Sequence, residues 1–164
     1  MNFLLNSEQV SSILLQALAA GCIGPAFAML FNVPARFLAL IALISALTRG
    51  LRALFVEYQL SIIIATFLAC CICSLILIYF GPKLRVPRPI LTVPCIISMI
   101  PGVDAYEALL ALLNITESIQ HTELTMHITT LFHSGMRAIG IIFAIAVGIA
   151  IPPLFFYKYR HAKF

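Results

Sequence analysis

Long apolar stretches, separated by short charged clusters, dominate the chain. Residues 9–35, 58–82 and 138–157 contain no Asp, Glu, Lys or Arg. A transmembrane helix needs about 20 predominantly apolar residues, so each of these stretches is long enough to span a bilayer. No Lys or Arg precedes the first stretch, and it is longer than the apolar part of a signal peptide. We therefore expect it to remain as a span.

Two further apolar stretches are interrupted by charges. Residues 37–56 contain two arginines, and residues 89–113 contain two carboxylates. Each stretch can still span if its charged side chains face protein or water instead of lipid. We predict an all-α integral membrane protein that forms a single transmembrane domain over residues 1–164, with about five spans and four as the alternative. The predicted spans are residues 10–31, 37–56, 58–80, 89–113 and 128–157.

Composition supports the membrane interpretation. Hydrophobic residues make up 62% of the 164 residues and charged residues only 10%, whereas a soluble domain carries about 25% charged residues. The chain therefore has too few charges to cover a soluble globular surface. The high apolar content also excludes a disordered chain, because such chains are poor in apolar residues.

The charges also indicate an orientation. Five spans put seven basic residues on one side without any acidic residue among them, and four acidic residues on the other. By the positive-inside rule, the C-terminus is then cytoplasmic and the N-terminus outside. The net charge of +4 thus points to orientation in the membrane and not to nucleic acid. The seven basic residues are Arg36, Lys83, Arg85, Arg88, Lys158, Arg160 and Lys163; the four acidic ones are Glu8, Glu57, Glu117 and Glu123.

The fourth predicted span is irregular. Pro94 and Pro101 lie within it, and Gly102 follows directly. Proline removes a backbone donor and clashes with the preceding turn, so these residues predict a helix break. Transporters often build binding sites from such discontinuous helices.

Asp104 and Glu107 follow this break, and two interpretations of them stay open. Asp-x-x-Glu before an apolar run resembles a capping box, in which Asp104 caps a new helix. Alternatively, one of the two carboxylates binds substrate or carries a proton, since intramembrane carboxylates are functional candidates.

Three arginines are exceptions to the topology rule. Arg49 and Arg52 lie near the outer end of the second span, and Arg137 lies in the last. Arginine offers a carboxylate a bidentate fork that stays charged, so Arg52 and Arg137 are candidates for a carboxylate path. The alternatives are that Arg52 snorkels to the outer interface and that Arg137 pairs with Asp104 or Glu107.

Other patterns predict structure instead of chemistry. Gly21, Gly24 and Pro25 indicate a kink or a close helix contact in the first span. The spacing of the histidines at positions 121, 127 and 133 matches no metal motif, so we expect no metal, no cofactor and no enzyme activity. All five cysteines lie in apolar stretches, and we interpret them as small hydrophobic residues. They are Cys22, Cys70, Cys71, Cys73 and Cys95.

Several of these irregular segments resemble one family. The stretches are Phe27–Arg36, Thr92–Pro94 with Ile100–Tyr106, and Gly148–Pro152 before a basic tail. They resemble the threonine/serine exporter (ThrE) family, and specifically the small, YjjB-like subunit of a split two-component exporter. The resemblance implies the C-terminal half of a ten-span exporter in the bacterial inner membrane, with a larger membrane protein supplying the other half. It also implies export of small carboxylates, either succinate or threonine and serine.

The resemblance carries over to seven residues. The family pattern also accepts small hydroxyl residues at the positions of Asp104 and Glu107, so these two match it less well. Two other functions stay open: a structural or assembly membrane protein, and a self-sufficient homo-oligomeric channel. The seven residues are Asn32, Pro34, Arg36, Arg52, Pro101, Gly102 and Tyr106.

Overall fold

The structure, a computed structural model, describes residues 7–84, 87–117 and 121–156. These residues form α-helices and short 3-10 turns without any strand, so the all-α prediction is confirmed. In chain order the elements are α1 (Ser7–Leu30), η1 (Ala35–Phe37), α2 (Leu38–Glu57), α3 (Ile62–Leu84), α4 (Arg88–Ile96), η2 (Ile97–Met99), α5 (Gly102–Glu117) and α6 (His121–Phe155).

Among the described residues, four helical segments are long and apolar enough to cross a membrane. A fifth span results if α4 and α5, which a short break separates, are counted together. The predicted number of four to five spans is therefore confirmed. The last helix begins at His121, seven residues before the predicted start of its span. The four segments are Ser7–Leu30, Ala35–Glu57, Ile62–Gly81 and Leu124–Phe155.

The chain divides into two compact units. The first takes in the residues up to Met99 and those from Ala144 onward, and the second is Ile100–Phe143. The helix α6 contributes its first part to the second unit and its last part to the first. The single transmembrane domain over the whole chain stays a prediction.

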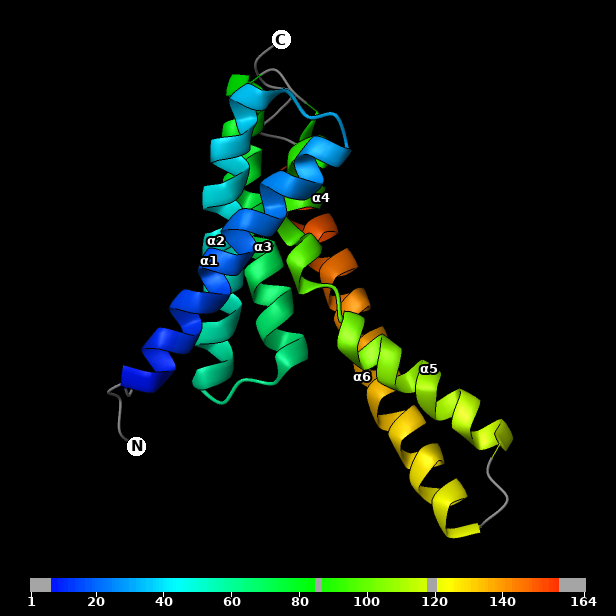
Figure 1. Ribbon diagram of the computed structural model, residues 1–164. Coiled ribbons are helices and arrows are strands. Elements are labelled where there is room, and N and C mark those ends of the chain that lie inside the picture. Colours follow the sequence, from blue (N-terminus) through cyan, green and yellow to red (C-terminus); the bar gives the residue numbers. More distant parts are fainter. Residues whose placement is uncertain (1–6, 85–86, 118–120, 157–164) are drawn as a thin grey trace. The chain divides into compact units, whose positions relative to one another are not determined.

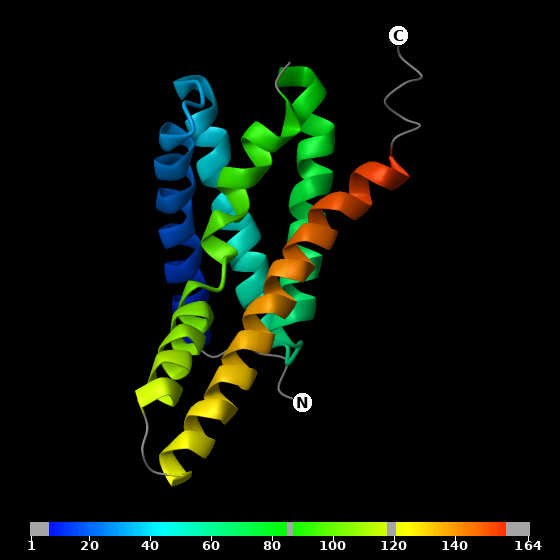
Figure 2. The same cartoon turned by 90° about the vertical axis from the view of Figure 1, so that its right-hand side faces the viewer.

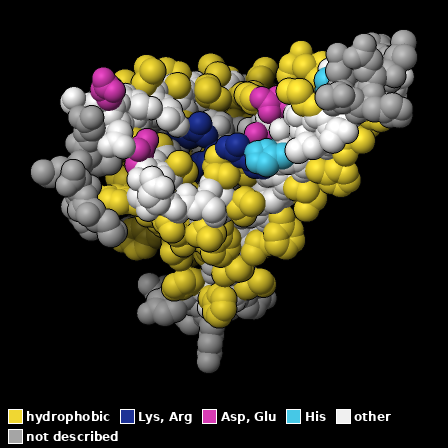
Figure 3. All heavy atoms as spheres, turned by 90° about the horizontal axis from the view of Figure 1, so that it is seen from below, with side chains coloured by type: hydrophobic (Ala, Val, Ile, Leu, Met, Phe, Trp, Pro, Cys, Tyr) yellow, Lys and Arg dark blue, Asp and Glu magenta, His cyan; other side chains and the backbone are white. Residues whose placement is uncertain are grey.

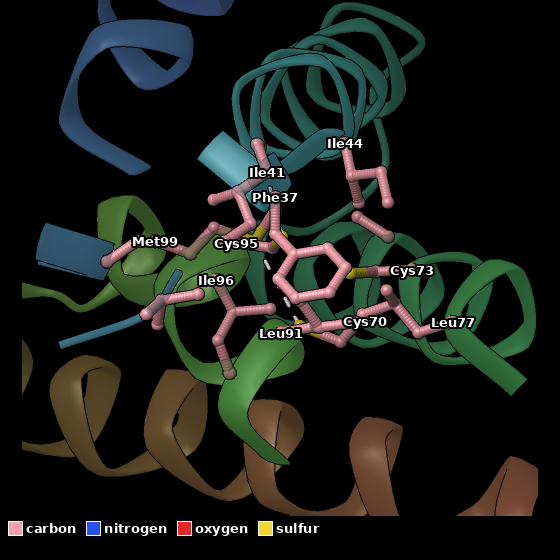
Figure 4. Close-up of a cluster of buried hydrophobic side chains, with 13 residues drawn as sticks. Phe37, Ile41, Ile44, Cys70, Cys73, Leu77, Leu91, Cys95, Ile96 and Met99 are labelled. Atoms are coloured by element: carbon pink, nitrogen blue, oxygen red, sulfur yellow. Dashed lines mark hydrogen bonds between the residues drawn. The ribbon is translucent and has the colours of Figure 1, made fainter. Parts of the chain in front are cut away.

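The first unit is built around α2. The helices α1 and α2 pack against each other along their length, and α3 and α4 also contact α2 (Figure 1, Figure 2). Figure 4 shows the core that these helices enclose, with the ring of Phe37 lying among Cys70, Cys73 and Leu91. This core is closely packed and largely apolar, and it holds α4 against α2 and α3.

Small residues let the helices approach closely. A Cβ added to Gly24 of α1 would lie only 2.8 Å from both Cβ and Oγ of Ser45 on α2. The Oγ of Ser45 donates a hydrogen bond of 2.8 Å to the carbonyl of Ala20. Membrane helices pack through such small residues and interhelical hydrogen bonds. The predicted close helix contact in the first span is therefore confirmed at Gly24.

The motif residue Asn32 ends α1. Its φ of 55° is left-handed, its N–H donates to the carbonyl of Met29, and the N–H of Val33 donates to that of Ala28. These two bonds form a Schellman motif, which asparagine tolerates better than most residues. Pro34 follows, where proline commonly prevents a helix from continuing. The backbone geometry of this turn thus explains why Asn32 and Pro34 suit these two positions.

Large apolar side chains cover much of the outside. Leu14, Leu43, Ile100, Phe132 and Phe143 are all more than half exposed. Figure 3 shows hydrophobic side chains over much of one face, together with several charged ones. Water disfavours so much exposed apolar surface, whereas lipid accepts it. The helices therefore present the surface of a multi-pass membrane protein.

Candidate functional site

The helix break lies between α4 and α5. The helix α4 ends at Ile96, the 3-10 turn η2 occupies residues 97–99, and α5 begins at Gly102. The N–H of Gly102 donates to the carbonyl of Ile100, and the N–H of Ala105 to that of Pro101. Pro101 cannot donate, so it stops the incoming helix and leaves its own carbonyl to start the next one. The predicted break at Pro101 and Gly102 is confirmed.

Pro94 was predicted to break the fourth span, but it lies within a continuous helix. It lies inside α4, two residues before the helix ends, and so does not break the helix at its own position. Proline removes the bond that its N–H would donate to the carbonyl of Ile90, and its ring crowds that same carbonyl. The helix ends within one turn, and few helical bonds depend on the missing one. The assignment of Pro94 as a helix-breaking residue was therefore wrong.

Two arginines of α2 donate hydrogen bonds to main-chain carbonyls at the helix break. Nη1 of Arg52 donates a hydrogen bond of 3.0 Å to the carbonyl oxygen of Met99, and Nη1 of Arg49 donates one of 3.4 Å to that of Ser98. Residues three apart lie on the same face of a helix, so both guanidinium groups point the same way. The end of a helix has unpaired carbonyls and a partial negative charge, which cations stabilise.

The alternative interpretation, in which Arg52 snorkels to the outer interface, was therefore wrong. Its side chain is only 6% exposed, so it does not snorkel to an interface. The snorkelling interpretation assumed that a lone arginine in an apolar span must seek water, but the broken helix supplies carbonyl acceptors inside the protein instead. The sequence marked Arg49 as a topology exception but did not place it at the break. The available signal was its spacing of three residues from Arg52.

The second unit contains an ion pair between α5 and α6. Nε of Arg137 lies 3.6 Å from Oδ2 of Asp104, with the two side chains 42% and 16% exposed. The predicted pairing of Arg137 is thus confirmed with Asp104. Because α5 begins at Gly102, Asp104 lies in its first turn and is not the N-cap, so the capping-box interpretation was wrong. A carboxylate in the first turn still interacts favourably with the helix dipole.

Glu107 lies on the same side of α5. Its Oε2 accepts a hydrogen bond of 3.1 Å from the hydroxyl of Ser134 on α6, a residue that is 3% exposed. Tyr106, by contrast, is 62% exposed. The ion pair and this hydrogen bond thus both join α5 to α6, while Tyr106 is largely exposed. The functional role of Tyr106 stays a prediction.

Arg36, the cysteines and the candidate metal ligands remain from the sequence analysis. The guanidinium carbon of Arg36 lies 4.6 Å from the centre of the Phe37 ring, and its side chain is exposed. The cysteines at positions 70, 73 and 95 are free and buried, as expected of small hydrophobic residues. Within the described ranges, no group of three or more His, Cys, Asp and Glu is arranged to hold a metal ion.

Comparison with known proteins then identifies the family. The family model described as "Threonine/Serine exporter, ThrE" matches residues 13–155. The chain belongs to the threonine/serine exporter family. The match includes the helix break, both arginines of α2, and the pair formed by Asp104 and Arg137. No solved structure matches the chain.

One relative places this match within a longer protein. The chain is 31% identical over 139 residues to an uncharacterized protein of Haemophilus influenzae (strain ATCC 51907 / DSM 11121 / KW20 / Rd). The aligned region covers 82% of this chain but only 44% of that protein. The chain thus spans less than half the length of the relative. Membership of a membrane transport family agrees with the several membrane-spanning helices.

Proposed function

We propose that the chain is one subunit of a two-component exporter that moves small carboxylates across the bacterial inner membrane. The exported solute is succinate, or threonine and serine. A larger membrane protein acts as the partner subunit. The observation that carries this proposal is the helix break, where Arg49 and Arg52 of α2 donate to main-chain carbonyls. The chain that contains this break belongs to the threonine/serine exporter family.

The chemistry of the break supports a path for carboxylates. A carboxylate in a low-dielectric segment needs a cationic partner, and arginine supplies two parallel N–H donors that match its oxygens. Arginine also stays charged inside a protein, because a guanidinium is not deprotonated at physiological pH. A discontinuous helix adds free backbone groups at membrane depth, as transporters use for their binding sites. Arg49 and Arg52 combine both features on one helix face.

The comparison with the longer relative supports a partner. More than half of that relative lies beyond its alignment with this chain. We infer that a second polypeptide supplies the corresponding part of the exporter. Helices such as α5 expose Val103, Leu109 and Leu113 to the surroundings, and such apolar faces suit either lipid or the spans of a partner.

The distribution of charge supports an orientation. Arg36 follows the first span and Arg88 precedes the fourth, and both lie on the side that carries the basic tail in a five-span arrangement. We propose that this side is the cytoplasm, with the N-terminus outside. The arginines of α2 then lie toward the outer half of the second span.

An efflux experiment tests the function. Cells that lack both exporter subunits are made to express this chain, the larger partner, or both, and the release of succinate, threonine and serine is followed. We expect release only when both are present, and the released solute identifies the substrate. Release by this chain alone would instead support a homo-oligomeric channel. No release of any of the three solutes would overturn the transport proposal in favour of an assembly protein.

A further inference from the structure

The two arginines at the break differ in how firmly the protein holds them. Arg52 is buried, and its hydrogen bond to Met99 has an ordinary length of 3.0 Å. Arg49 is only partly buried, and its bond to the carbonyl of Ser98 is long at 3.4 Å. Hydrogen bonds weaken as the donor and acceptor separate. The guanidinium of Arg49 therefore exchanges its carbonyl contact for a ligand more easily than that of Arg52.

Arg49 also retains most of its hydrogen-bonding capacity. A guanidinium has five N–H donors, and the contact with Ser98 uses one of them. In the part of the chain that the structure describes, Arg49 forms no ion pair. The nearest carboxylate along α2, Glu57, accepts a hydrogen bond of 2.8 Å from Gln9 instead. A positive charge on a membrane helix, without a carboxylate partner among the described residues, favours an anionic ligand.

The hydroxyl of Ser98 gives a second indication. Its Oγ is buried and has no hydrogen-bond partner among the described residues. A buried polar atom without a partner is energetically unfavourable, and such an atom calls for an explanation. Ser98 is also the residue whose carbonyl Arg49 contacts. Arg49 and the hydroxyl of Ser98 thus both have unused hydrogen-bonding capacity, and Arg49 already contacts the main chain of Ser98.

We propose that Arg49 binds the carboxylate of the exported solute, that the hydroxyl of Ser98 provides a further contact, and that Arg52 is a positioning residue which holds the broken helix end. This inference rests on the proposed function and assigns its binding site. A carboxylate can accept two N–H bonds from the fork of Arg49. The long bond to the Ser98 carbonyl is the contact that the solute replaces.

This division of roles suits each of the alternative solutes, because they share one group. Succinate, threonine and serine differ in size and charge, but each has a carboxylate that a guanidinium recognises. Arg49 therefore provides affinity for the class. Selection within the class falls to groups that contact the rest of the solute.

The test measures transport kinetics of the complete exporter, reconstituted in vesicles from both subunits. The KM for the transported solute is compared among wild type, Arg49→Gln, Arg49→Lys, Ser98→Ala and Arg52→Gln. Arg36→Gln is the matched control, because it removes an exposed arginine away from the break. Thermal stability of each purified complex is measured in parallel.

We expect Arg49→Gln to raise the KM by about tenfold or more without lowering the melting temperature, since a charge-assisted contact is lost. Arg49→Lys, which keeps the charge without the fork, should give a smaller rise. Ser98→Ala should raise the KM severalfold and leave the stability unchanged or higher, because an unpartnered hydroxyl is removed. Arg52→Gln should chiefly lower the melting temperature.

Two results distinguish the ways in which this can fail. A wild-type complex that transports none of the three solutes contradicts the proposed function itself. A wild-type complex that transports, with Arg49→Gln and Arg49→Lys both at the wild-type KM, overturns the assignment of Arg49 alone. An unchanged KM in Ser98→Ala removes the hydroxyl from the site, because an idle hydroxyl would affect only stability.

Discussion

Nη1 of Arg52 donates a hydrogen bond of 3.0 Å to the main-chain carbonyl of Met99, the last residue of the turn that ends α4. A buried arginine and an interrupted helix are each costly in a membrane. Here the arginine and the helix break stabilise each other, because the guanidinium donates to a carbonyl that has lost its helical partner. The pairing fixes where α4 ends against α2.

We expect Arg52→Gln to lower the free energy of unfolding by about 1–3 kcal/mol, because a buried carbonyl loses a charged donor. Thermal unfolding of the purified protein in detergent measures this. Arg36→Gln, which changes an exposed arginine, should alter the melting temperature little. Equal effects of the two substitutions would contradict the structural role of Arg52.

The crossing of α3 and α6 depends on Gly148. A Cβ added there would lie 2.8 Å from Cβ of Cys70 and 2.9 Å from the carbonyl oxygen of Phe67. We expect Gly148→Ala to cost about 1–3 kcal/mol through overpacking. Gly135→Ala is the matched control on the same helix, because its nearest neighbour would be Cβ of Ala108 at 3.8 Å. It should be neutral or stabilising, and a Gly148→Ala variant as stable as this control would contradict the close crossing.

The left-handed turn at Asn32 gives a prediction about residue type. We expect Asn32→Val to destabilise the protein by about 1–2 kcal/mol, because a β-branched residue is strained at a φ of 55°. Asn32→Gly keeps the turn accessible and should remain close to wild type. Thermal unfolding of both variants distinguishes them. If valine is tolerated as well as glycine, the turn does not constrain this position.

The pair of Asp104 and Arg137 is best measured by a double-mutant cycle. The variants are Asp104→Asn, Arg137→Gln and the double variant, compared by free energy of unfolding. We expect a coupling energy of about 1 kcal/mol, because the pair is partly exposed and its atoms are 3.6 Å apart. Strict additivity of the two single effects would show that the carboxylate and the guanidinium do not stabilise each other.

The proposed orientation predicts the result of reporter fusions. A phosphatase that is active only outside the cytoplasm should be inactive when fused to the C-terminus. It should be active when fused after Gln59, in the short connection between α2 and α3. Opposite activities at both positions would reverse the orientation, and activity at both would contradict an odd number of spans between them.

Much of the fold follows from the sequence, because length and apolarity decide which segments span. The charge-free runs became α1, α3 and the last part of α6, and Pro101 with Gly102 gave the break where it was expected. The exact helix starts were harder to predict. Pro94 shows why: a proline within a turn of the helix end removes only one bond, and nothing local distinguishes it from a helix breaker.

The candidate site was predictable only in part. The chain marks Arg49, Arg52 and Arg137 as unusual, since charges within apolar spans are costly. Their partners depend on which helices meet, and periodicity does not determine this. Asp104 as the partner of Arg137 was one of two named alternatives, whereas the bonds from Arg49 and Arg52 to main-chain carbonyls have no signature in residue identity.

The most direct test of a carboxylate path through the break is uptake of labelled solute into vesicles that contain both purified subunits. Succinate, threonine and serine are each measured with the wild-type complex and with Arg49→Gln. We predict saturable uptake of at least one solute by the wild type, and a KM raised about tenfold or more in the variant. Uptake that is absent in the wild type, or identical in the two complexes, would contradict a path that depends on the arginines of α2.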